Sequence, residues 1–144
     1  MLFFFATCVS AALFSHFYLR QDQSAPPGDL FRVINTQLAA FRTDDYPRAY
    51  QQASLNFQQR FTVDQFKQMI TADYARVLTG SRVEFGPVQF LSRRAQIQVF
   101  FIEPSGNVHV CIYSLVNEGE VWKVDGAKLM RPWPTSHRMT GVRS

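Results

Sequence analysis

The hydrophobic periodicity of the chain changes once, near residue 81, and this change limits the folds that the chain can adopt. Before residue 81 the apolar residues recur every three to four positions, whereas after it they alternate with polar residues. Helices that precede strands, instead of alternating with them, are typical of an α+β domain whose helices pack on one face of an antiparallel sheet. The composition permits such a core, because 47% of the 144 residues are hydrophobic and 18% are charged.

Three helices are expected before the change of period, over residues 29–41, 46–53 and 62–78. The Asp29 carboxylate can cap the free N–H groups of the first helix. Pro47 fits the first turn of the second helix, where a missing N–H costs nothing. Thr62 and Gln65 form a capping box at the start of the third. The three helices therefore have recognisable beginnings in the sequence.

Four strands are expected after the change of period, over residues 82–90, 95–102, 108–116 and 120–129. Gly86 and Pro87 interrupt the first of them, so we expect a bulge or an edge strand that bends the sheet. Turn residues at 104–107 and 117–119 lead each strand into the next. The pattern predicts a curved, four-stranded antiparallel sheet.

The first 19 residues form a separate, hydrophobic unit. Residues 2–19 contain no Asp, Glu, Lys or Arg, and this length lies between a signal-peptide core and a spanning helix. No basic residue precedes Arg20, and the small-residue site at 9–11 would cut the apolar run in half. We therefore expect an N-terminal hydrophobic helix that anchors the chain in a membrane, with the body extracytoplasmic. An exported form that follows signal cleavage is the alternative.

Four segments follow from these patterns. Residues 1–19 are the anchor or signal-like segment, and residues 20–28 are a polar linker with a Pro-Pro-Gly break. Residues 29–130 are the folded domain, and residues 131–144 are a basic tail.

The charge distribution argues against nucleic acid as a partner. The net charge of +4 comes from the carboxyl end, because residues 126–144 hold four bases and no acid, whereas the preceding residues hold 11 of each. A neutral body gives little of the positive field that phosphate binding needs. The two cysteines form no metal-binding pattern with histidine, so no metal and no cofactor are expected.

Two motifs and the end of the last strand identify a family resemblance. These segments are INTQLAAFRTDD from Ile34, FTVDQFKQMITADY from Phe61 and WKVDGAKL from Trp122. Over about residues 30–130 the chain resembles the bacterial family called domain of unknown function 4864, within the nuclear transport factor 2-like, or cystatin-like, superfamily. The resemblance implies a cone-shaped fold that encloses a cavity. It implies no activity, because the superfamily includes both enzymes and binding domains.

Candidate site residues fall into two groups. Asp45 and His109 are candidates for a catalytic base, although helix capping and a position at a strand end explain them as well. Tyr50, Tyr74, Tyr113 and Trp122 are candidates for the cavity lining, because each has an apolar ring and one polar group.

Two functions follow as hypotheses. The first is a membrane-tethered domain that binds a small apolar ligand or a protein partner without catalysis, with a homodimer through the open sheet face. Gln96, Gln98 and Phe100 share one side of a strand and suit such an interface. The alternative is a small isomerase, lyase or hydrolase that acts on a hydrophobic substrate in the cavity.

Overall fold

The computed structural model of the chain describes residues 27–78 and 80–130. The helices are α2 (Pro27–Arg42), α3 (Tyr46–Gln51), α4 (Leu55–Arg60), α5 (Val63–Asp73) and α6 (Ala75–Leu78), and the strands are β1 (Arg82–Leu91), β2 (Arg94–Ile102), β3 (Val108–Glu118) and β4 (Val121–Leu129). The α+β prediction is confirmed. The predicted anchor and the basic tail lie outside the described residues. Among the described helices, none has the length and apolar character needed to cross a membrane.

The helical half contains more segments than the three that the sequence predicts. α2 begins at Pro27, two residues before Asp29, because proline is tolerated at the start of a helix. The short helix α4 was not predicted, and it begins where the Ser54 side chain accepts a hydrogen bond from Phe57 N. The predicted third helix is divided at Tyr74, whose backbone leaves the helical conformation with φ −122°. The Tyr74 hydroxyl donates to Ala127 O of β4 at 3.0 Å, so a tertiary contact accompanies the break.

The four strands form a meander in the order β1-β2-β3-β4, with every neighbouring pair antiparallel. The predicted bulge in β1 is confirmed, because the register with β2 shifts between Phe85 and Val88. Gly86 lies against Phe100, since a Cβ at Gly86 would meet the Phe100 ring at 2.6 Å. A second, unpredicted bulge lies in β4, where Asp125 has no partner between two paired residues.

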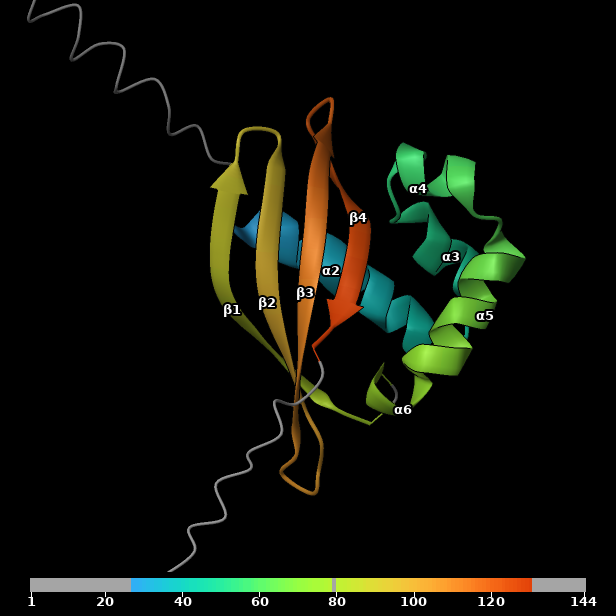
Figure 1. Cartoon of the computed structure of the whole chain (residues 1–144), viewed down its shortest axis with the longest axis vertical. Coiled ribbons are helices and arrows are strands. Elements are labelled where there is room, and N and C mark those ends of the chain that lie inside the picture. Colours follow the sequence, from blue (N-terminus) through green and yellow to red (C-terminus); the bar gives the residue numbers. More distant parts are fainter. Residues whose placement is uncertain (1–26, 79, 131–144) are drawn as a thin grey trace, which may run out of the picture.

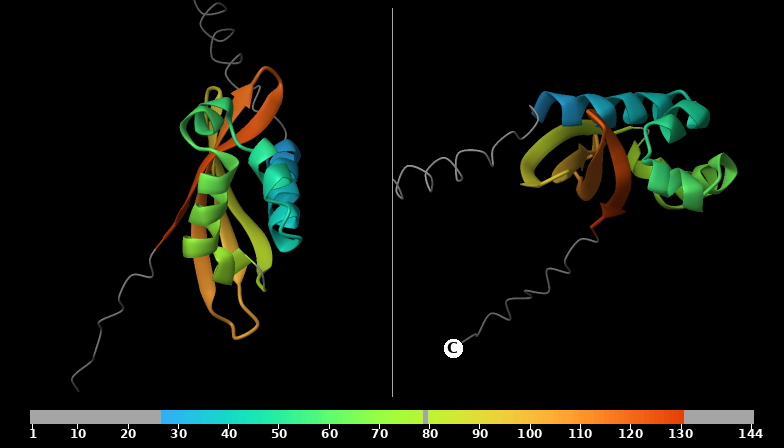
Figure 2. Two further views of the ribbon diagram at one scale, coloured as in Figure 1. Left: turned by 90° about the vertical axis from the view of Figure 1, so that its right-hand side faces the viewer. Right: turned by 90° about the horizontal axis from the view of Figure 1, so that it is seen from above.

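The helices lie on one face of the sheet and beyond its β4 edge (Figures 1 and 2). α2 crosses this face, and the apolar side chains of its inner surface meet those of the central strands, including Ile34 and Ile97, which are fully buried. The first half of β4 also pairs with the chain before α4, through Ser54 N to Val124 O at 2.8 Å and Val124 N to Gln52 O at 2.8 Å. No described element covers the opposite face of the sheet.

Candidate ligand-binding cavity

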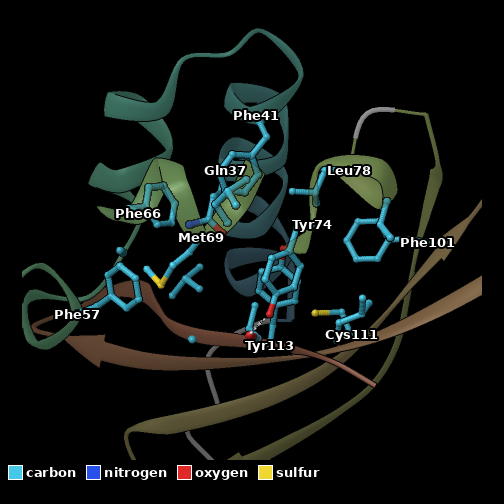
Figure 3. Close-up of a pocket in the computed structure, with 17 residues that line it drawn as sticks. Gln37, Phe41, Phe57, Phe66, Met69, Tyr74, Leu78, Phe101, Cys111 and Tyr113 are labelled. Atoms are coloured by element: carbon cyan, nitrogen blue, oxygen red, sulfur yellow. Dashed lines mark hydrogen bonds between the residues drawn. The ribbon is translucent and has the colours of Figure 1, made fainter. Parts of the chain in front are cut away.

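A cavity of about 120 Å³ lies between the helices and the helix-facing side of the sheet. One wall comes from α2, α4, α5 and α6, and the other comes from β2, β3 and β4. Figure 3 shows Phe57, Phe66 and Met69 at one end and Phe101 and Leu78 toward the other. The cavity therefore lies where the helices and the sheet are separated from each other.

The cavity is lined by buried residues and has a partly exposed mouth. Phe66 and Phe101 are almost fully buried. At the mouth, Met69 and Ile70 of α5 are half-buried, and Ala127 of β4 is exposed. The Tyr74 bond to Ala127 O spans these two rims and fixes the distance between α5 and the free end of β4.

Four of the lining side chains carry polar groups. Gln37 from α2 is 3% exposed, and its Nε2 donates to Ala49 O at 3.3 Å. Tyr113 from β3 is also 3% exposed, and Cys111 lies two residues before it on the same face of the strand. Figure 3 shows Tyr74 and Tyr113 side by side in the middle of the cavity. The wall of the cavity thus combines apolar side chains with four neutral polar groups.

Burial keeps the ionisable groups of the cavity protonated. It raises the pKa of the Cys111 thiol from 9.0 to about 12, because the thiolate would lose its hydration. Burial also raises the pKa of the Tyr113 phenol, and the neighbouring Cys111 and Tyr74 add to the effect. The pKa of Tyr74 is raised by burial as well, and the neighbouring Cys111 adds to the effect. At neutral pH all three groups are therefore uncharged.

No charged residue and no histidine is present among the described residues that line the cavity. The described part of the chain also has no cluster of three or more His, Cys, Asp or Glu side chains that could hold a metal ion. The chemistry that the cavity offers is hydrophobic contact together with a few neutral hydrogen-bonding groups.

Two of the four predicted lining residues, Tyr74 and Tyr113, line this cavity. Tyr50 packs against Phe66 with ring centroids 5.8 Å apart, and its hydroxyl donates to Phe61 O at 2.6 Å. Tyr50 therefore connects α3 to α5 and to the end of α4. Trp122 lies near the far end of β4 and lines a separate hollow with Arg32 and Glu120. It packs edge-on against Phe90.

The two predicted candidates for a catalytic base lie elsewhere. The Asp45 carboxylate accepts a hydrogen bond from Arg48 N at 3.1 Å and caps α3. His109 Nε2 lies 2.8 Å from Glu103 Oε1 beside the turn between β2 and β3. Hydrogen bonds from His109, Asn107 and Ser105 lower the pKa of Glu103, so this group is bound into its own turn. The structure brings neither candidate to the cavity wall.

Sequence reasoning missed Gln37 and Cys111 as cavity residues. Gln37 occupies a position in the apolar stripe of α2, and a polar side chain at a core position was the signal that could have identified it. Cys111 is a free, buried cysteine in β3. Its contact with the cavity depends on the helices opposite, which strand alternation does not reveal.

A family model matches most of the chain. The model of the family described as "Domain of unknown function (DUF4864)" matches residues 24–136. No curated protein and no solved structure matches the chain.

Proposed function

The chain belongs to the DUF4864 family, and we propose that it is a non-catalytic binding protein that holds a small apolar ligand in the cavity between its helices and its sheet. The observation that supports the proposal is the lining of the cavity, which is apolar apart from four neutral polar groups. An acid–base reaction needs a base within hydrogen-bond reach of the substrate. Because Asp45 and His109 lie elsewhere, the cavity offers no carboxylate or imidazole for that role.

The size of the cavity limits the ligand. A cavity of about 150 Å³ with apolar walls accepts benzene. The cavity of this chain is about 120 Å³, with a partly exposed mouth. It therefore suits one ring or a short branched chain, and not a drug-sized molecule, which fills roughly 300 to 1,000 Å³.

Native mass spectrometry of the gently purified full chain tests this function. We expect a mass above that of the polypeptide, with a small molecule released on denaturation. The proposal fails if the chain carries no passenger and if no benzene-sized molecule binds when it is added.

A homodimer through the open sheet face is a second candidate function. The face away from the helices carries a group of half-buried apolar side chains: Phe100, Ile102, Val110, Ile112 and Val116. Exposed apolar patches of this kind often mark protein interfaces. Gln96 and Gln98 on the same face, of which Gln98 pairs with Ile112, would supply polar contacts.

Ile112→Lys tests the dimer, because it places a charge at the centre of this face. We expect a dimer for the wild type and a monomer for the variant in native mass spectra. Leu55→Lys is the matched control, since Leu55 is 61% exposed in α4 and does not belong to the sheet. A monomeric wild type contradicts the dimer and leaves ligand binding untouched.

We also propose that residues 1–19 tether the domain to a membrane with the body extracytoplasmic, and that the domain is a nuclear transport factor 2-like cone. The uncharged run of residues 2–19 supports the tether. Helices on one face of a bulged antiparallel sheet, with a cavity between the layers, support the cone. Recovery of the full chain in the alkali-washed membrane fraction is the expected result for the tether.

A further inference from the structure

Two polar groups of residues that line the cavity have no hydrogen-bond partner in the described chain. The Tyr113 hydroxyl makes no hydrogen bond, and the Gln37 Oε1 carbonyl makes none, although Gln37 Nε2 is bonded to Ala49 O. Among the described residues, the fully buried side-chain atoms without a hydrogen-bond partner are Ser81 Oγ and Trp122 Nε1. The Tyr113 hydroxyl and the Gln37 carbonyl are not among them, and both residues line the cavity.

These two groups are complementary in their hydrogen-bonding roles. The phenol of Tyr113 donates one hydrogen bond, and the amide oxygen of Gln37 accepts one. Buried polar groups in proteins are almost always paired, so an open donor and an open acceptor in an apolar cavity indicate what is to be bound there. A hydroxyl group could satisfy both, because it accepts through its oxygen and donates through its proton.

We infer that the ligand is a neutral, phenol-like molecule, with an apolar body of about the size of benzene and one hydroxyl group between Tyr113 and Gln37. This inference rests on the proposed binding function and gives it a ligand class. A hydrocarbon would fill the same space but would leave both polar groups unpaired. Water alone would pair them but would leave the apolar ends of the cavity unfilled.

The charge of the ligand follows from the lining. A buried carboxylate or ammonium group needs a partner of opposite charge, and no described residue of the lining supplies one. The tyrosines and the thiol stay protonated at neutral pH, as described above, so they supply no charge either. The site therefore discriminates against organic ions.

Phenol and toluene are the probes for this inference, because they differ by a hydroxyl in place of a methyl group. Binding to the full chain can be followed through the ¹³C-labelled methionine methyl groups in NMR spectra. The chain contains four methionines, and Met69 lines the cavity whereas Met130 is 45% exposed outside it. A shift at Met69 with none at Met130 reports occupation of the cavity itself.

Tyr113→Phe is the decisive variant, and Tyr50→Phe is its matched control. Tyr113→Phe removes the open donor, so we expect the affinity for phenol relative to toluene to fall about tenfold, which is the effect of one lost hydrogen bond. Tyr50→Phe removes a hydroxyl that is bonded to Phe61 O outside the cavity, so it should leave this ratio unchanged. Gln37→Met removes the open acceptor and should lower the ratio in the same direction.

The outcomes separate the two proposals. If neither probe shifts Met69, the cavity does not bind ligands and the proposed function fails together with this inference. If both probes bind and the ratio is the same in the wild type and Tyr113→Phe, the phenol-like class is wrong while the binding function stands. Benzoate binding is measured on the wild type alone. Benzoate binding as tight as that of phenol would overturn the requirement for a neutral ligand.

Discussion

Ser54 joins α4 to the sheet, and its replacement by alanine should be unusually costly for so small a change. Ser54 is fully buried, and its hydroxyl makes two hydrogen bonds. It accepts from Phe57 N at 3.1 Å as the cap of α4, and it donates to Asp125 Oδ1 at 2.6 Å. Asp125 stands in the bulge of β4, and its side chain is 16% exposed.

The expected loss follows from these two bonds. Removal of a capping hydroxyl costs about 1 kcal/mol. Removal of a hydrogen bond to a charged group costs about 1.5 to 3 kcal/mol. The Asp125 carboxylate keeps a 3.5 Å contact with Arg94, so we take the lower part of that range and expect Ser54→Ala to lower the free energy of unfolding by about 3 kcal/mol.

Urea unfolding of the wild type and the variant measures this loss. Thr62→Ala is the matched control, because Thr62 caps α5 through Gln65 N at 3.2 Å but is exposed and has no bond to the sheet. It should cost about 1 kcal/mol. Equal losses for the two variants would refute the reasoning, because the bond to Asp125 would then contribute nothing.

Three further predictions concern the core and the sheet. The free energy of unfolding should fall as the pH rises above about 9, because the unfolded chain releases the Cys111 proton near pH 9.0 whereas the folded chain holds it to about pH 12. Urea unfolding at pH 8 and pH 10 measures this change, and equal stability at the two pH values would contradict it. Iodoacetamide should modify Cys111 after denaturation and not in the folded chain, because the thiol of the folded chain is buried and protonated. Peptide mapping measures the modification, and equal rates in both states would show that the thiol is accessible. Gly86→Ala should lower the free energy of unfolding by about 1 to 3 kcal/mol, because the added Cβ would meet the Phe100 ring at 2.6 Å. An unchanged urea midpoint would mean that the Phe100 ring moves aside without cost.

Local signals in the sequence were sufficient for most of the secondary structure. The capping box at Thr62 and Gln65 is formed by both of its hydrogen bonds, and the strands lie within two residues of the predicted bounds. Gly86 and Pro87 marked the bulge in β1, because a central strand does not accept this pair. The break at Tyr74 and the helix α4 were not predicted, since each involves a bond to β4 that no local pattern contains.

The residues of the cavity were likewise only partly predictable from the sequence. Strand alternation placed Tyr113 and Cys111 on one face of β3, which is the face that the helices cover. Tyr50 and Trp122 have the same chemical character as the tyrosines of the cavity, but they lie behind the helices and at the far end of β4. Side-chain type alone cannot distinguish a residue beside a void from a residue in contact with its neighbours.

The sequence by itself determined the four strands and most of the helical segments, because capping, turn chemistry and periodicity act over a few residues. The tertiary structure decided where the two layers separate and which polar groups are left open between them. Those properties depend on α2, α5 and β4 together, and the space they enclose between Gln37, Met69 and Tyr113 has no counterpart in the local sequence.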